Sequence, residues 1–201
     1  MGRPKKVPDE AVLEAVGRAI GRRGPDGFTI REVAQDTGIA PATVMQRFGS
    51  RRRLLRAFVQ GGVARLDAAF APRPGDRVAD VLVRAFGADV AHAPRTGEMA
   101  NHIAMLAADL GDPHLRRATR AHFVRVRAGI GSLLRDAVRT GGLRPIDDLT
   151  GLARTLEATC HGTLVVWAVV PQGNLEDALR ATIGTALRPF EPERSPTHHP
   201  L

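Results

Sequence analysis

The sequence has little of the chemistry that marks secreted, redox or membrane proteins. Its 201 residues include a single cysteine, Cys160, so no internal disulfide can form. Residues 1–8 are polar and basic, which gives no sign of a secretory signal peptide. The longest nearly continuous apolar run, residues 164–170, is far shorter than the ~20 residues of a membrane span, and we expect a buried helical segment there. These absences predict a cytoplasmic protein with no membrane partner.

Aromatic residues and catalytic motifs are also scarce. Tyrosine is absent and aromatics make up 4% of the chain, so stacking platforms for single-stranded nucleic acid are poorly supplied. There is no P-loop, no dinucleotide fingerprint, no nucleophile elbow and no paired-cysteine or HExxH metal spacing. Cys160 and His161 are adjacent and therefore diverge by about 100° on a helix, which separates a nucleophile from its base. We expect no enzyme activity, no metal and no cofactor.

Positive charge is present and is concentrated at one end of the chain. The formal net charge is +8; residues 1–60 hold 12 Lys and Arg against 6 Asp and Glu, whereas residues 61–201 hold 17 against 15. A basic end on a nearly neutral body indicates a polyanionic partner for that end alone. Because stacking aromatics are few, double-stranded DNA is the favoured polyanion.

Residues 28–55 contain the pattern of a helix-turn-helix DNA reader. Thr29, followed three positions later by Glu32, predicts a capping box that opens the first helix of the pair. Gly38 supplies the tight turn, and Pro41 occupies a favoured first-turn position of the second, recognition helix. These local signals predict two short helices held at a fixed angle.

Polar side chains of the recognition helix are predicted to contact DNA. Thr43, Gln46 and Arg47 are expected to point outward, where they can reach base edges or phosphates; the alternative for each is an ordinary solvated helix residue. The basic arm at residues 2–6 either lies along the minor groove or adds only non-specific attraction. The predicted DNA-contact residues are Arg3, Lys5, Lys6, Thr29, Thr43, Gln46, Arg47, Arg51 and Arg52.

The helix that follows the reader begins with an unusual run of charge. Ser50 is predicted to cap this helix, and its first turn is Arg51, Arg52 and Arg53. Cations at a helix N-terminus oppose the helix dipole, so an anion is expected there. A phosphate held by the free N–H groups and these guanidinium groups would turn the conflict into a binding site.

These residues resemble the TetR family of one-component bacterial transcriptional regulators. The resemblance covers about 45 residues and rests on residues 27–30, 32–34, 37–39, 42–44, Phe48, Ser50, Leu54 and Leu55. The chain differs from the family at Ala40, Met45, Arg47 and Arg51 with Arg52, where a Ser cap, a Tyr, a His and a Lys-Glu pair are usual. Met45 lacks the hydroxyl that a Tyr offers to phosphate, whereas the arginines keep or add positive charge.

The resemblance implies an all-α fold of about nine helices. Residues 1–50 would form a three-helix bundle with the helix-turn-helix, residues 51–190 a larger helical domain for ligand binding and dimerisation, and residues 191–201 a disordered tail. Helical periodicity agrees: it predicts helices from residues 9–22 at the start to a last one capped by Asn174. Gly61 and Gly62 interrupt the helix over residues 50–70, either as a hinge or to allow close packing.

The family further implies a homodimeric repressor, paired through its last two helices, that a small molecule releases from a palindromic operator. Its effector would be apolar, because the pocket predicted between the middle helices has mostly apolar walls. For each polar residue of this pocket, histidines included, ordinary packing is the alternative role. The predicted ligand-contact residues are Phe86, Met99, Asn101, His102, Met105, Leu106, His122 and Phe123.

A ligand-released repressor has two alternatives. An architectural DNA-binding protein without an effector would bind many sequences alike. A helical enzyme that carries a DNA-binding motif would need a buried polar constellation in its body.

Overall fold

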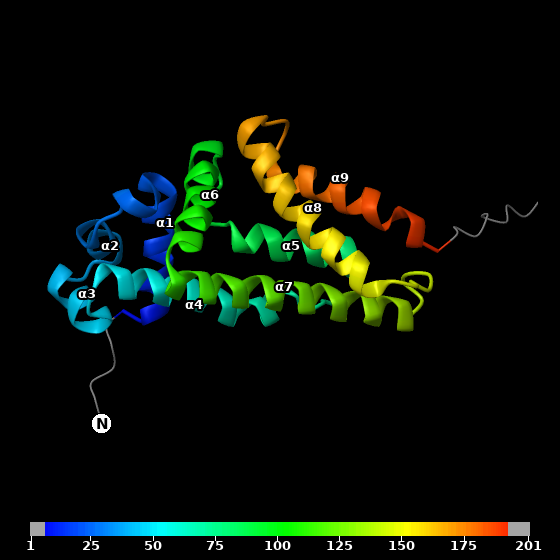
Figure 1. The fold of residues 1–201 in the computed structure, drawn as a ribbon, viewed down its shortest axis with the longest axis horizontal. Helices are drawn as coiled ribbons and strands as arrows, with labels where there is room; N and C mark the ends of the chain where they lie inside the picture. Colours follow the sequence, from blue (N-terminus) through cyan, green and yellow to red (C-terminus); the bar gives the residue numbers. More distant parts are fainter. Residues whose placement is uncertain (1–6, 193–201) are drawn as a thin grey trace, which may run out of the picture.

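The computed structural model describes residues 7–192, and over that range the chain is entirely helical, which confirms the predicted all-α fold (Figure 1). The predicted basic arm, with Arg3, Lys5 and Lys6, and residues 193–201 of the predicted tail lie outside the described residues. The helices are α1 (Asp9–Gly27), α2 (Ile30–Thr37), α3 (Pro41–Phe48), α4 (Arg51–Ala69), α5 (Val78–Asp89), α6 (Thr96–Gly111), α7 (Pro113–Arg139), α8 (Leu149–Val169) and α9 (Leu175–Leu187), followed by a 3-10 turn (Arg188–Phe190).

The helices form an elongated molecule with α2 and α3 at one end and α9 toward the other (Figure 1). The long helices α4 and α7 run side by side along the length of the molecule. Helix α6 packs against α1, and α8 packs against α9. Helices α4, α6 and α7 therefore connect the end that carries the helix-turn-helix to the body.

Helix α1 extends beyond its expected stop at residue 22. Gly24 breaks the regular helix with a left-handed φ of 76°, and one further turn, residues 25–27, follows before the chain enters α2. Glycine adopts this conformation without the steric cost that other residues carry. The predicted stop signal thus acts as a kink.

Helix α4 is continuous through Gly61 and Gly62. A Cβ atom at Gly61 would lie 3.1 Å from Cδ1 of Leu13 on α1, a tight contact, whereas a Cβ at Gly62 would meet nothing within 4 Å. Close packing therefore accounts for Gly61. Gly62 instead leaves open space beside the helix.

Two hydrophobic clusters form the core. The N-terminal cluster contains the buried faces of α1, α2 and α3, but it also includes Leu54 of α4, Met105 of α6 and Leu115 of α7. The second cluster joins α5 to the later helices, with Leu82, Ile130 and other large side chains fully buried. A division of the chain at residue 50 stays a prediction, and side chains beyond that point complete the N-terminal core.

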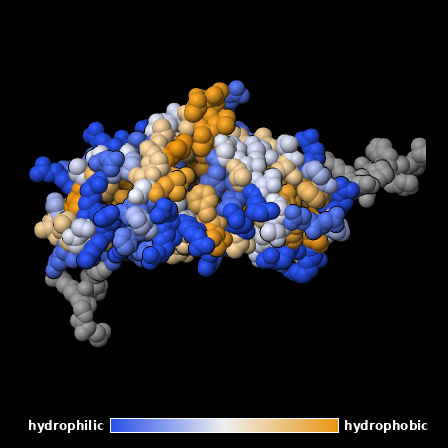
Figure 2. All heavy atoms as spheres, viewed as in Figure 1, coloured by the Kyte–Doolittle hydropathy of each residue, from blue (hydrophilic) through white to orange (hydrophobic). Residues whose placement is uncertain are grey.

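The apolar run at residues 164–170 is not buried along its whole length, contrary to expectation. It is helical as far as Val169, and Leu164 and Trp167 pack inside the body, but Val166 and Val169 are 62% and 74% exposed. These two valines lie three positions apart and therefore share one face of α8. Figure 2 shows a hydrophobic surface at the top of the molecule, where the C-terminal end of α8 lies.

Candidate nucleic-acid interface and effector cavity

The DNA-binding end of the chain, formed by helices α1, α2 and α3 and called the reader below, is built by local signals that the sequence predicted. Thr29 accepts a hydrogen bond from the backbone N–H of Glu32, whose carboxylate accepts one from the Thr29 N–H, so the capping box is confirmed. Gly38 ends α2 with a left-handed φ of 67°, and Pro41 begins α3. Val44 is fully buried, which fixes the rotation of α3 against the bundle.

Helix α3 presents a short polar and sulfur-bearing surface. Gln46 and Met45 are exposed, and Thr43 is half-buried. Thr29 lies at the start of α2, and its hydroxyl is already hydrogen-bonded to Glu32 at 3.1 Å. Gln46 and Thr43 are therefore the predicted contact residues on α3 whose side chains form no hydrogen bond to another described residue.

Arg47 does not point outward as expected. Its Nη1 donates a 2.7 Å hydrogen bond to the carbonyl oxygen of Val7 and lies 3.6 Å from the Asp9 carboxylate, and the side chain is only 15% exposed. The guanidinium is held against the start of α1 because it finds both a carbonyl and a carboxylate there. Arg47 thus ties the recognition helix to α1.

Arg51 is also turned inward, and its phosphate contact stays a prediction. Its Nε donates to the carbonyl oxygen of Phe28 at 3.1 Å, and its Nη2 donates to the carbonyl oxygen of Pro25. The guanidinium carbon lies 4.2 Å from the centre of the Phe28 ring, a cation–π contact. Arg51 therefore stabilises the connection between α1 and α2.

Arg52 joins the reader to the body. Its Nε donates a 2.8 Å hydrogen bond to the carboxylate of Asp112, and its Nη2 donates to the same oxygen. Asp112 caps α7, with its other carboxylate oxygen 2.8 Å from the backbone N–H of His114. Asp112 lies 60 positions from Arg52 in the sequence, so the sequence alone did not predict this ion pair.

Ser50 caps α4 as predicted, accepting a hydrogen bond from the Arg53 backbone N–H at 3.1 Å. The side chains of Arg53 and of Arg56, one turn later, are exposed and form no ion pair with a described residue. Sequence reasoning overlooked Arg56, although its spacing from Arg53 places the two on neighbouring positions of one helix face.

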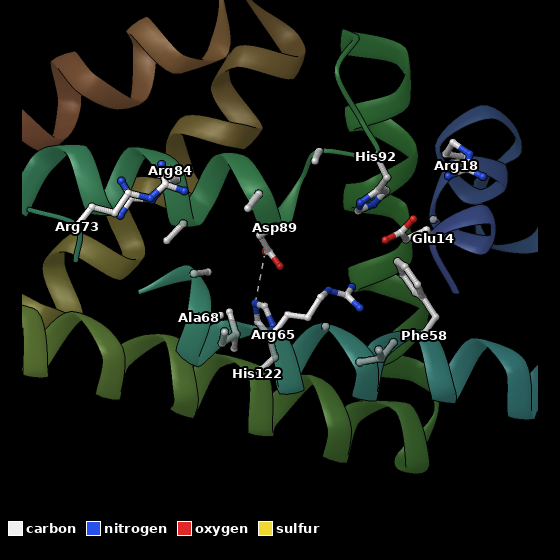
Figure 3. A pocket seen from close by; sticks show the side chains of 18 residues that line it. Glu14, Arg18, Phe58, Arg65, Ala68, Arg73, Arg84, Asp89, His92 and His122 are labelled. Carbon is white, nitrogen blue, oxygen red and sulfur yellow. Dashed lines mark ion pairs between the residues drawn. The ribbon is translucent and has the colours of Figure 1, made fainter. Parts of the chain in front are cut away.

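A cavity of about 700 Å³ lies between the reader and the body (Figure 3). It is bounded by α1, α4, α5, the segment after α5 and α7. Arg65 of α4 extends into this space toward Phe58, and Gly62 lines it as well. Charged side chains from three helices also face it: Glu14, Arg18, Arg65, Arg84 and Asp89.

The cavity is more polar than the predicted apolar pocket and draws on different residues. Among the predicted ligand contacts, His122 lines it. His102 lies next to it, since its Nδ1 is 3.1 Å from Nε2 of the cavity residue His92. Asn101 is engaged elsewhere, donating to the carbonyl oxygen of Gly21 at 2.7 Å. The other predicted contacts do not line this cavity: Phe86, Met99, Met105, Leu106 and Phe123.

A network of ionisable groups lies along the body side of the cavity. The Asp89 carboxylate is 3.5 Å from Nε2 of His122. Burial opposes ionisation of Asp89, but the hydrogen bond and charge of His122 outweigh it and hold the pKa of the carboxyl below its usual value. Burial likewise disfavours a charged His122, yet Asp89 raises the pKa of that imidazole. Each group thus favours the charged form of the other.

His92 is uncharged near neutral pH. Burial, followed by the neighbouring His102, lowers the pKa of His92 to about 4. A Cβ at Gly21 of α1 would lie 2.6 Å from the His92 carbonyl oxygen, and one at Gly17 would lie 3.3 Å from the His92 side chain. Glycines spaced one helical turn apart thus let α1 approach the segment between α5 and α6.

The cavity residues of α1 carried no signal in the sequence. Glu14 and Arg18 occupy the polar face of an amphipathic helix, which ordinarily faces solvent. Gly17, by contrast, stood out among the alanines and valines of the buried face and could have indicated close packing. Within the described residues, no helix is long and apolar enough to cross a membrane.

Two family models match the chain. Residues 12–58 match that of bacterial regulatory proteins of the tetR family, and residues 74–190 match the C-terminal domain of BetI-type transcriptional repressors. The HTH-type transcriptional regulator BetI of Rhizobium meliloti (strain 1021) is 29% identical over 167 residues, which cover 79% of this chain and 77% of that protein.

Solved structures share the fold. A putative TetR-family regulator from Rhodococcus sp. has a TM-score of 0.64 at 24% identity, with 89% of this chain and 96% of that chain covered. A putative transcriptional regulator from Saccharomonospora viridis, solved in complex with choline, has a TM-score of 0.70 at 20% identity, with 92% and 98% covered.

Both family models describe transcriptional regulators, and members of this family bind DNA and small-molecule effectors, act as dimers and are not enzymes. The helix-turn-helix at residues 28–55 and the separate helical body agree with that description. The comparisons therefore confirm the resemblance read from the sequence and the exclusion of an enzyme. The chain belongs to the TetR family of DNA-binding transcriptional regulators, with a C-terminal domain of the BetI type.

Proposed function

We propose that this regulator binds a palindromic operator as a homodimer, represses transcription, and is released by a small molecule that occupies the cavity between reader and body. The observation that carries the proposal is the composition of the cavity wall. Glu14, Gly17 and Arg18 belong to α1 of the reader, whereas Arg65 and Asp89 belong to the body. A ligand there touches both parts at once.

The cavity lies where a small displacement moves the reader. Helix α1 approaches the segment between α5 and α6 at Gly17 and Gly21, with no room for a side chain at either glycine. A ligand that separates α1 from Phe58 or His92 changes the orientation of the reader relative to α4 and the body. Release then follows if the ligand binds the reoriented state more tightly than the DNA-bound state.

On the DNA side, Thr43 and Gln46 of α3 are proposed to read base edges in the major groove. Two copies of α3 in a dimer would enter successive major grooves about 34 Å apart, which requires a roughly palindromic operator. Thr29 and Arg52 are retained as proposed phosphate contacts near the ends of α2 and α4. Arg47 and Arg51 support the reader from within, as their internal hydrogen bonds favour.

Dimerisation is proposed to use α8 and α9. The exposed apolar face of α8, with Val166 and Val169, offers the kind of surface that homodimer interfaces bury. Small residues such as Gly162 and Gly184, which have open space around them, would let helices of the partner approach closely. We place the reader at residues 1–50 and the dimeric, ligand-binding body at residues 51–190, in a protein that acts in the cytoplasm, where its DNA is found.

The effector is proposed to be a small organic molecule with a charged or strongly polar group, since Arg65, Glu14 and Asp89 face the cavity. An apolar effector, as expected from the sequence, stays the alternative. Choline is the first compound to test, because it occupies the similar regulator from Saccharomonospora viridis and the body here matches the BetI-type model. Phe58 and the two carboxylates supply the aromatic face and negative charge that a quaternary ammonium group requires.

Selection of bound sequences from random duplex DNA tests the reader and the dimer together. A single palindrome is expected, and a specificity ratio near one in competition gel shifts would favour an architectural protein instead.

Gly62→Leu then tests the cavity, because Gly62 lines it with open space around its Cα. We expect this variant to bind the operator normally but to resist release by effector. Gly87→Leu, which fills open space on α5 outside this cavity, is the matched control.

A further inference from the structure

A continuous groove runs between α4 and α7 on the body side of the reader. One part is lined by Ser50, Arg53 and Asp112 among others, and the next by Gln60 and Ala121 among others. The two parts share Arg56 and His114, so they form one groove. It begins at Ser50, the capping residue of α4 that follows the recognition helix, and extends along α4 as far as Val63, a length of about 20 Å.

The groove is strongly cationic. Neither α4 over residues 51–66 nor α7 over residues 113–135 contains an Asp or Glu. Asp112, an acid that lines the groove, is already paired with Arg52. Arg53, Arg56 and Arg117 line the groove without forming an ion pair to any described residue.

This charge does not stabilise the folded chain. Arginines that lie close together without a carboxylate repel one another, and the repulsion costs free energy in the isolated protein. Further along α7, Arg125 pairs with Asp67 and Arg127 with Glu157, whereas Arg135, outside the groove, forms no ion pair with a described residue. What distinguishes the groove is that unpaired arginines of two helices, Arg53 and Arg56 of α4 and Arg117 of α7, line the same space, which favours an external anion.

We propose that the groove binds the phosphate backbone of double-stranded DNA that flanks the operator half-site. Continuity with the reader supports this occupant, because the groove starts where α3 ends and α4 begins. The groove lining contains no Phe or Trp on which unpaired bases could stack, which favours duplex over single-stranded nucleic acid. Arginine guanidinium groups bind phosphate well but do not read sequence from the backbone.

The function that follows is an extension of the binding site beyond the bases that α3 reads. Contacts to flanking phosphates would raise affinity without adding sequence specificity and would make binding more sensitive to salt. The proposal rests on DNA binding by the reader and adds a second surface, located on the body.

The test compares two duplexes with the full-length protein: one limited to the selected palindrome, and one extended by about one helical turn of arbitrary sequence on each side. The slope of log Kd against log salt concentration is measured for each. Arg56→Gln with Arg117→Gln is expected to flatten the slope on the extended duplex by about 2–4 units, since a dimer loses up to four phosphate contacts. On the short duplex this variant should bind like the parent protein.

Arg135→Gln is the matched control, because Arg135 is an exposed arginine of α7 that lies outside the groove. The Arg56→Lys and Arg117→Lys double variant should keep most of the slope if charge is responsible. An unchanged slope on the extended duplex would overturn the proposal, as would an equal change in the Arg135→Gln protein or an equal loss on both duplexes. Failure of the parent protein to bind any palindrome would instead count against the proposed repressor function.

Discussion

The guanidinium of Arg52, in the first turn of α4, is hydrogen-bonded through two nitrogens to a single carboxylate oxygen of Asp112, the cap of α7. The pair connects the helix that follows the reader to the longest helix of the body. The pKa of Asp112 is held below its usual value, first by the backbone N–H of His114 and then by Arg52. The carboxylate thus acts both as a helix cap and as an ion-pair partner.

Substitution of Asp112 is expected to separate these two roles. Asp112→Ala should lower the melting temperature by about 2–4 °C, because α7 loses its cap and Arg52 its acceptor. Asp112→Asn keeps a capping oxygen and should lose less. Arg52→Ala should have the smallest effect, since exposed ion pairs contribute little. Thermal unfolding followed by circular dichroism measures all three, and equal losses for the alanine and asparagine variants would argue against a capping role.

Arg51→Ala is expected to destabilise the protein by about 1–3 kcal/mol, because two backbone carbonyl groups lose their donor and Phe28 loses a cation–π contact. Arg51→Lys should recover only part of this, since an ammonium cannot reproduce the planar fork. Urea unfolding gives the free energies. The salt slope of operator binding should remain that of the parent protein, and a loss of about two units, one for each subunit of the dimer, would show that Arg51 contacts phosphate.

The local signals of the reader were predictable, whereas its long-range contacts were not. The capping box of Thr29 and the left-handed turn at Gly38 depend on residues within a few positions, so sequence spacing is sufficient to identify them. Arg51 and Arg52 find their acceptors 26 and 60 positions away, at Pro25 and Asp112. Helical periodicity does not indicate pairings between such distant residues. The run of arginines therefore predicted unpaired charge, whereas in the folded chain Arg51 and Arg52 have acceptors.

The cavity was harder to predict for a related reason. Its walls come from α1 as well as from the body. In the sequence pattern, Glu14 cannot be distinguished from any solvent-exposed residue of an amphipathic helix. The expectation from the family pointed to apolar residues of α5, α6 and α7, of which Phe86 and Met99 instead fill the core. Only His122 was identified correctly as a residue of this space.

Acidification is expected to destabilise the protein between about pH 6.5 and pH 4. Burial lowers the pKa of His92 from 6.5 to about 4, and burial also lowers the pKa of His102. As the pH is lowered, these histidines therefore take up protons in the unfolded chain before they do so in the folded protein. The free energy of unfolding decreases as the pH falls across this range. His122, whose pKa is raised by Asp89, and Asp109, whose pKa is raised by burial, oppose the effect, so the expectation depends on the large shift of His92.

Melting temperatures measured at pH 7.5 and pH 5 test this expectation. His92→Gln removes one of the groups and should show a smaller loss on acidification than the parent protein. His114→Gln, at an exposed position of α7, serves as the control and should behave like the parent. A parent protein that becomes more stable toward pH 5 would contradict the expectation.

A carboxylate on the exposed face of α8 is expected to prevent dimerisation. Val166→Glu with Val169→Glu places two charges in the proposed interface, where burial of unpaired charge is unfavourable. Light scattering after size-exclusion chromatography should report a monomer, and operator binding should weaken. Val124→Glu, at a similarly exposed apolar position on α7, is the control and should remain dimeric. A dimeric α8 variant would place the interface elsewhere.

The hydrophobic core of the reader also bears on how such regulators can be recombined. Met105 and Leu115, from the corner between α6 and α7, complete that core, so the first three helices are not an independent module. A chimera that joins this reader to a foreign body would leave their positions empty or filled with side chains of the wrong shape. Transfer of DNA specificity from this protein should therefore succeed more often by exchanging the surface of α3 alone, or by moving the α6–α7 corner together with the reader.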